Sequence, residues 1–328
     1  MLQATTVTSV GDNDAGHALF GHISHAQVSS DGDLFIFDDQ LQRLSRFASD
    51  GTYIDEFGGL GDGPTEFRFA TGFVLLGGGV VAVLDRSRLR LFARDGDQWE
   101  FLRFLRLPTP DAHDACTTDG AALFISGPGS ESDDEQVSAY PNIHGVSVPG
   151  GTTQSLGMGY RADAAALRWD LSSGPIACPS LHDTGVLVFA FGLIPVVRAY
   201  DRGSGELIWE SEIADYLQLG IRQRPGRRGG AGATLYFGRD HDHTARVHQL
   251  PGGNILVQTL RYSEATNARV PRTYLVDGPS GMGALISETL PEIASFFDHG
   301  YVALMEDPFP RVEIRRYTDQ MAKRLRDS

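Results

Sequence analysis

The sequence is poor in cysteine and in long apolar stretches. Its two cysteines, Cys116 and Cys178, allow at most one intramolecular disulfide, which excludes a small fold held together by several bridges. No stretch is apolar for long enough to span a bilayer, and the first residues lack the basic segment and apolar run of a secretory signal. We therefore expect a soluble chain, either cytoplasmic or exported after loss of a signal segment.

Positive charge is also scarce. The 328 residues include 28 basic and 42 acidic side chains, Lys323 is the single lysine, and the formal net charge is −14. An acidic protein repels phosphate backbones and anionic lipid surfaces, so we expect no nucleic-acid partner.

The motifs of several enzyme classes are missing too. No GxSxG elbow, Walker loop or dinucleotide fingerprint occurs between a strand and a helix, so hydrolase, nucleotide-binding and Rossmann chemistry lack support. Asparagine is scarce and the expected inner strands carry few acids, which argues against a calcium site.

Glycine is abundant, and it follows a repeat. The 39 glycines and 16 prolines are spread between short apolar runs. An apolar strand, an Asp-Gly or Gly-Gly turn, a second apolar strand and an aromatic residue with another glycine turn recur about six times. This pattern predicts an all-β, six-bladed β-propeller with four antiparallel strands in each blade. The last repeat has only three convincing strands, so we expect the N-terminal TTVTSV to join it and close the ring.

No linker-like change of composition divides the chain, so we expect one domain over residues 1–328. The expected blades cover approximately 22–67, 68–108, 109–160, 165–217, 232–289, and 290–317 together with 3–10.

The junction between the first two repeats is the most specific motif. It reads FASDGTYIDEFGGLGDGPTEF over residues 47–67. Glycines there allow positive φ in the crossover between blades, while Pro64 and Phe67 fix the entry to the next strand. The junction resembles the NHL-repeat signature through Phe47, Asp50, Gly51, Gly61, Asp62, Gly63, Pro64, Glu66 and Phe67. The resemblance covers roughly residues 20–107 and implies a bacterial six-bladed propeller of the NHL- or TolB-like kind.

Histidines form the first candidate site. His25 and His113 each lie seven residues before the glycine of an Asp-Gly turn, which predicts equivalent positions on the inner strands of blades one and three. His243 or His248 would supply a third ligand from blade five. Three histidines from alternate blades suit zinc or another divalent ion with open coordination positions, similar to the zinc site of peptidylglycine lyase propellers. The alternative is that these histidines are hydrogen-bonded fillers of the channel.

Two further clusters are candidates. The segment GRDHDHTARVH carries Asp242, His243 and Arg246, which form either an acid/base pair, an anion site or a solvated loop; His113 and Asp114 are a second acid/base pair. The segment RQRPGRRGGAG either attracts a carboxylate, sulfate or phosphate group or is a solvated insertion; its arginines are Arg222, Arg224, Arg227 and Arg228.

Three functions remain open from the sequence. The first is a non-catalytic propeller that binds a small molecule or a protein over its channel face. The second is a metal-dependent lyase or hydrolase that uses the histidines of blades one, three and five. The third is a metal-free enzyme with histidine and aspartate acid/base groups at the channel mouth. The substrate, the partner and the oligomeric state are not visible in the sequence.

Overall fold

The computed structural model describes most of the chain. The described residues are 3–11, 19–96, 98–118, 120, 122–129, 140–151, 153–161, 165–178, 185–225, 231–236, 240–250, 253–278 and 280–318. Only the backbone is described at residues 165–166, 221–225, 231–234 and 236.

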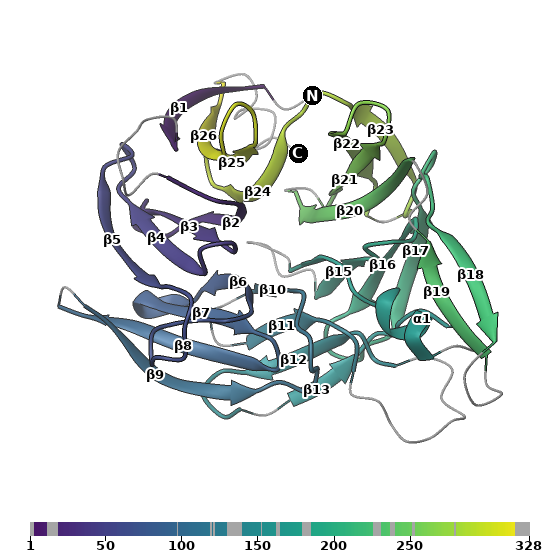
Figure 1. Cartoon of the computed structure of the whole chain (residues 1–328), viewed down its shortest axis with the longest axis horizontal. Coiled ribbons are helices and arrows are strands. Elements are labelled where there is room, and N and C mark those ends of the chain that lie inside the picture. The colour runs from purple at the N-terminus through teal and green to yellow at the C-terminus, as the bar shows by residue number, and fades with distance from the viewer. Residues whose placement is uncertain are drawn as a thin grey trace. The chain divides into compact units, whose positions relative to one another are not determined.

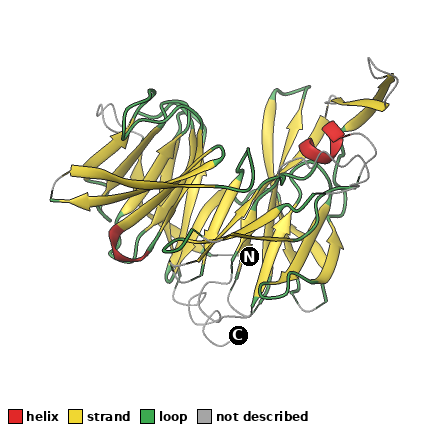
Figure 2. Ribbon diagram, turned by 90° about the horizontal axis from the view of Figure 1, so that it is seen from below, coloured by secondary structure: helices red, strands yellow, loops and turns green. Residues whose placement is uncertain are grey.

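The described chain forms two compact units. Unit 1 comprises Met1–Leu105 and Pro291–Ser328, and unit 2 comprises Arg106–Leu290. Strands account for nearly all regular structure (Figure 2). Six sheets each contain four antiparallel strands, which confirms the all-β, six-bladed propeller that the repeats predict (Figure 1). Within the described residues, no helix is long and apolar enough to cross a membrane.

Unit 1 holds the first, second and sixth blades. Blade one consists of β2 (Ile23–Val28), β3 (Leu34–Asp38), β4 (Arg43–Phe47) and β5 (Tyr53–Gly58). Blade two consists of β6 (Ala70–Leu75), β7 (Val80–Asp85), β8 (Arg88–Asp95) and β9 (Gln98–Arg106), with a short 3₁₀ turn, η2 (Gly77–Gly79), between β6 and β7. Blade six consists of β24 (Glu292–Phe297), β25 (Gly300–Met305), β26 (Arg311–Tyr317) and β1 (Ala4–Val10).

The N-terminal strand completes the last blade. β1 pairs antiparallel with β26, from Ala4 opposite Tyr317 to Val10 opposite Val312. The carboxylate of Glu313 accepts a hydrogen bond of 3.0 Å from the Thr6 hydroxyl across this pair. The predicted closure by TTVTSV is therefore confirmed, and β1 covers the edge that β26 would otherwise expose.

Unit 2 holds the other three blades. Blade three consists of β10 (Asp114–Thr117), β11 (Ala122–Ser126), β12 (Ile143–Ser147) and β13 (Thr153–Leu156). Blade four consists of β14 (Ile176–Ala177), β15 (Val186–Ala190), β16 (Val196–Asp201) and β17 (Leu207–Glu212). Blade five consists of β20 (Asp240–Gln249), β21 (Ile255–Ser263), β22 (Ala268–Val276) and β23 (Gly283–Ser287).

Two elements of unit 2 lie outside the blades. The helix α1 (Ala165–Asp170) precedes blade four, and a separate hairpin of β18 (Gly220–Pro225) and β19 (Ala231–Tyr236) precedes blade five. The hairpin projects beside α1 (Figure 2). The repeat pattern predicts neither element.

The hydrophobic core lies between neighbouring blades. Strands alternate their side chains, so one face of a blade packs on the preceding blade and the other on the following blade. In blade one, Leu34 and Ile36 pack toward blade six, whereas Phe35 and Phe37 pack toward blade two. In unit 2, one such layer joins blades three and four and another joins blades four and five.

A disulfide also joins blades three and four. Cys116 lies on β10 and Cys178 directly follows β14, and their Cα atoms are 5.5 Å apart. Two hydrogen bonds run beside it: Ser126 Oγ donates to the Gly174 carbonyl at 2.6 Å, and the Ile176 N–H donates to an Asp114 carboxylate oxygen at 3.1 Å.

The junction motif is held differently from the sequence-based expectation. Gly58 and Gly59 adopt positive φ, but Gly61 and Gly63 do not. The Glu66 side chain packs against both: its carboxylate accepts the Gly63 N–H at 2.7 Å and would lie 2.0 Å from a Cβ at Gly61. The expectation of positive φ in this junction therefore holds at Gly58 and Gly59 and is wrong at Gly61 and Gly63.

Arg90 of β8 contacts the same junction. Its guanidinium donates to the carbonyls of Glu66 and Pro64 and lies 5.3 Å from the ring centroid of Phe67. Phe67 itself is fully buried and makes edge contacts with Phe57 and Phe92. The motif thus fixes blade two against blade one through a buried aromatic ring and a stacked arginine.

Candidate functional site

Several connecting segments of unit 2 lie together at one end of blade four. Antiparallel pairing puts the start of β14, the β15–β16 loop and the end of β17 together at one end of blade four. The longer segments at this end include α1, which precedes blade four in the sequence, and the β18–β19 hairpin, which precedes blade five. We therefore take this end of unit 2 as the place to look for a site.

On β20, the inner strand of blade five, Asp242 is fully buried. Arg261 of β21 approaches it with two nitrogens, at 2.9 and 2.6 Å from the two carboxylate oxygens. Asp242 also holds Leu217: its carboxylate accepts the Leu217 N–H at 2.8 Å, and its own N–H donates to the Leu217 carbonyl at 2.9 Å. Both carboxylate oxygens of Asp242 are therefore used in hydrogen bonds, and the bonds to Leu217 anchor the segment that leads into the hairpin.

His243 lies next along β20, on the other face of the strand. Burial, together with the nearby His113, Arg269, Arg246 and His241, lowers the pKa of His243 to about 4. Its Nε2 would lie 3.5 Å from a Cβ at Gly192. The structure therefore brings the predicted residues His113, His243 and Arg246 together within unit 2, with His243 neutral at neutral pH.

Asp114 forms the link to blade four described above and also accepts the Ala115 N–H at 2.8 Å. His113 donates its backbone N–H to the Ser126 carbonyl at 2.8 Å. Both residues thus stand at the entry of β10, where catalysis by them stays a prediction.

The strand registers correct one sequence-based equivalence. The hairpin of blade one closes with Val28 opposite Leu34, and that of blade three closes with Thr117 opposite Leu123. On this alignment His25, opposite Phe37, corresponds to Asp114, opposite Ser126. The equivalence of His25 and His113 is therefore wrong by one residue, which turns the side chain to the other face of the blade. The reason is that Gly32 and Gly120 occupy different places in their turns.

The predicted metal ligands are divided between the units, with His25 in unit 1 and His113, His243 and His248 in unit 2. Among the described residues there is no group of three or more His, Cys, Asp or Glu side chains that is arranged to hold a metal ion. Coordination of zinc by these histidines stays a prediction.

The arginine-rich segment is described only in part. The backbone of Arg222 and Arg224 belongs to β18, opposite Thr234 and Gly232 of β19. Arg227 and Arg228 lie outside the described residues. An anion site formed by these side chains stays a prediction.

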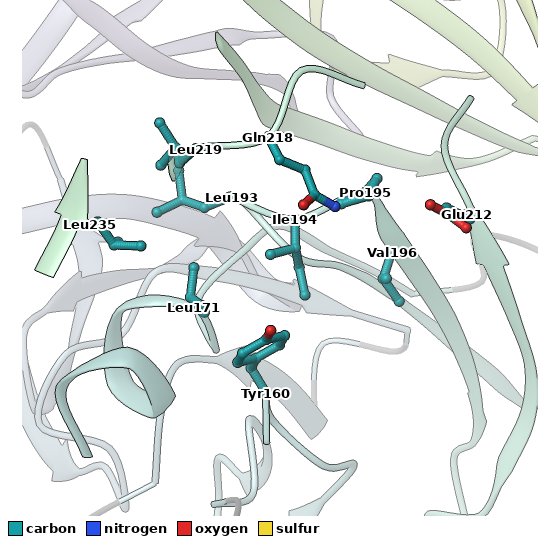
Figure 3. Close-up of a pocket in the computed structure, with 10 residues that line it drawn as sticks. All are labelled: Tyr160, Leu171, Leu193, Ile194, Pro195, Val196, Glu212, Gln218, Leu219 and Leu235. Atoms are coloured by element: carbon teal, nitrogen blue, oxygen red, sulfur yellow. The ribbon is translucent and has the colours of Figure 1, made fainter. Parts of the chain in front are cut away.

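A pocket of about 250 Å³ opens at the same end of blade four (Figure 3). Its apolar walls come from the segment after α1, the β15–β16 loop, the segment after β17 and strand β19: they are Leu171, Leu193, Ile194, Pro195, Val196, Leu219 and Leu235. Tyr160, Gln218 and Glu212 add polar groups. Glu212 is the one charged side chain that lines the pocket among the described residues.

The segment 215–219 contributes Gln218 and Leu219 to the pocket and is fixed by hydrogen bonds to neighbouring strands. The Asp215 carbonyl accepts from Arg261 and, at 3.2 Å, from Arg272. The Tyr216 hydroxyl donates to the Gly192 carbonyl at 2.9 Å, and burial raises the pKa of Tyr216, which keeps this hydroxyl protonated. Gly192 directly precedes the wall residues Leu193–Pro195 and lies beside His243. The hydrogen bond from Tyr216 to Gly192 therefore supports both the pocket and the region around His243.

The sequence interpretation missed the pocket. Its residues come from five separate segments, so no local motif marks them. The available signal was the loop GLIP at residues 192–195, which is apolar although it connects two strands.

Comparison with known proteins supports the fold. Residues 16–142 match a family model described as a 6-bladed β-propeller, DUF5128. No curated protein matches the chain in sequence.

Three solved structures share the architecture. A Bacteroides fragilis protein named as a candidate exported protein is 11% identical, with 97% of this chain and 96% of that chain covered and a TM-score of 0.59. A DUF4221 member from Bacteroides vulgatus is 10% identical, with 97% and 98% covered and a TM-score of 0.59. Virginiamycin B lyase from Staphylococcus aureus is 9% identical, with 97% and 99% covered and a TM-score of 0.50. At these identities the likeness shows the six-bladed fold alone.

Proposed function

We propose that this protein is a binding propeller that takes a small ligand with an apolar body and a cationic or hydrogen-bond-donating group. The observation that carries the proposal is the pocket at the end of blade four, with its apolar walls and one carboxylate. Its volume of about 250 Å³ is below the roughly 300–1,000 Å³ of sites for drug-sized molecules, so the ligand is small.

The chemistry of the walls defines the ligand class. Apolar walls favour a ligand that gains by leaving water, at about 25 cal/mol for each Å² of apolar surface buried. Glu212 is exposed at the lip and forms no ion pair with a described residue, so its carboxylate is available to a cation. Gln218 and the Tyr160 hydroxyl supply neutral hydrogen-bonding groups.

A matched pair of probes tests this proposal. Phenethylamine and 3-phenylpropionate carry similar apolar bodies and opposite charges at neutral pH, and isothermal titration calorimetry measures their binding to the full chain. We expect the amine to bind at least tenfold more tightly than the acid, and Glu212→Gln to remove most of that preference.

A filling variant locates the site. Ile194→Trp places a large side chain in the centre of the pocket (Figure 3) and should abolish binding of the amine. Ile208→Trp, on the exposed part of β17 outside the pocket, is the control and should bind as the wild type does. Equal binding of the amine by both variants would overturn the proposal.

Within six-bladed propellers, we assign the chain to the NHL type. The support is the junction motif, in which Arg90 and the buried Phe67 join blades one and two. The motif is complete only there.

A second candidate function is acid/base or metal chemistry at His113 and His243. The observation in its favour is the neutral, buried imidazole of His243, which is the form that ligates metals. A pKa of about 4 makes His243 a weak general base at neutral pH, so binding ranks first. Metal analysis of protein purified without a chelating column tests this candidate, and one bound equivalent that is lost in His243→Ala would support it.

A further inference from the structure

The outermost strand of blade two, β9, is an unusual edge strand. It is nine residues long and ends the sheet order β6-β7-β8-β9. One face is anchored: Trp99 stacks on Phe57 with ring centroids 4.7 Å apart, and Phe101 makes an edge contact with Phe92. The other face carries Glu100, Leu102, Phe104 and Arg106 and is exposed.

Three other outer strands are short or polar, and the outer strands β17 and β23 also expose apolar side chains but have only six and five residues. β13 has four residues, β5 carries Asp55 and Glu56, and β1 is rich in threonine and serine. Short length and charged or polar side chains prevent edge strands from pairing with other chains. β9 combines exposed apolar side chains, Leu102 at 51% and Phe104 at 54%, with a length of nine residues.

The sequence of β9 is complementary to itself. An antiparallel pair of β9 strands related by a twofold axis at Arg103 puts Leu102 opposite Phe104 of the second copy. The same register puts Glu100 opposite Arg106 of the second copy, and the symmetry makes each of these pairs twice. Opposite charges and apolar residues that face each other across antiparallel strands stabilise the pairing.

Neighbouring registers lack this match. A twofold axis at Leu102 puts Glu100 opposite Phe104, and an axis at Phe104 puts Leu102 opposite Arg106. Registers shifted by a single residue set the anchored face of one strand against the exposed face of the other. The charge pattern therefore favours the register with the axis at Arg103, and it favours a second copy of this chain as the partner.

We propose that β9 is a homodimer interface, in which two copies of this chain pair antiparallel about Arg103 and join their second blades into one eight-stranded sheet. The contact is isologous, so it closes on itself and does not extend into fibres. This interface is separate from the ligand pocket, and neither proposal depends on the other.

A charge swap tests the register. Sedimentation velocity of the wild type over a wide range of concentration should show a species of twice 35.6 kDa. Glu100→Arg and Arg106→Glu each place like charges opposite one another at two positions, and each should weaken the dimer by about tenfold or more. The double variant restores both opposite-charge pairs and should dimerise as the wild type does.

Two substitutions at the axis complete the test. Arg103 faces its own copy in the proposed register, so Arg103→Thr removes a repulsion and should tighten the dimer. Arg103→Cys should form a disulfide between copies on oxidation, seen as a dimer on a non-reducing gel, whereas Glu100→Cys should not.

A wild type that stays monomeric at every concentration would overturn the proposal. A dimer that the two single charge variants leave unchanged, or that the double variant does not recover, would also overturn it. The disulfide of the wild-type chain is intramolecular and remains in all variants, so it does not affect the gel result.

Discussion

Removal of the Cys116–Cys178 disulfide should lower the free energy of unfolding by an amount that follows from the length of the loop that the bridge closes. The bridge closes a loop with a sequence separation of 62. In the chain-entropy model a loop of that length corresponds to about 4 kcal/mol in the free energy of unfolding. The Cα separation of 5.5 Å lies within the usual range for a disulfide, so the native backbone fits the bridge.

The variant Cys116→Ala with Cys178→Ala suits the surroundings, because both sulfurs pack against the apolar layer between blades three and four. The hydrogen bonds from Ser126 and Ile176 remain and keep the two inner strands together in the native state. The loss should therefore come mainly from the unfolded chain, which gains freedom when the loop is opened.

Guanidinium denaturation followed by circular dichroism measures the effect. We expect a free energy of unfolding lower by up to about 4 kcal/mol and a melting temperature lower by about 6 °C for a chain of this length. Peptide mapping without reduction confirms the bridge in the wild type. If the mapped bridge is present and the double variant unfolds at the same denaturant concentration, the loop-closure reasoning is refuted.

Other predictions concern the buried polar groups. Arg261→Met leaves the buried carboxylate of Asp242 without its partner and should cost about 3–5 kcal/mol in the free energy of unfolding; a loss below 1 kcal/mol in urea denaturation would contradict this. Arg90→Met removes the hydrogen bonds to the junction carbonyls and should lower stability by about 1–3 kcal/mol, whereas Arg88→Met, beside it on β8, should have a smaller effect. Burial lowers the pKa of His243 in the folded state below its unfolded value. The free energy of unfolding should therefore be unaffected by His243 above about pH 6.5 and should fall as the pH drops toward 4, by up to about 1.4 kcal/mol per pH unit. His243→Gln should reduce this slope in melts between pH 4 and 7, and an unchanged slope would show that His243 does not cause it.

The repeat pattern predicted the parts of the fold that depend on local periodicity. Apolar runs separated by glycine turns identify strands, and the counting of strands per repeat required TTVTSV to complete blade six, which β1 does. Both inferences work because alternation of side chains follows directly from burial on one face of a blade.

Register was harder to predict, because a turn glycine marks a turn but not the strand positions beside it. Gly32 and Gly120 lie at different places in turns of equal length, so phasing on them misaligned His113 by one residue. The pocket was beyond this kind of reasoning for another reason. Tyr160, Ile194 and Leu219 become neighbours only after α1 and the β18–β19 hairpin pack around blade four.

The pairing of β1 with β26 has a consequence for synthesis on the ribosome. Unit 2 is one continuous segment, whereas unit 1 needs both β1 and β26, which lie on either side of unit 2 in the sequence. Unit 2 is therefore able to finish folding before β26 is synthesised, and unit 1 has to wait with β1 unpaired until β26 emerges. A chain that stops before Arg311 lacks the partner of β1 and leaves blade six incomplete, so quality control has a clear feature by which to recognise truncated products.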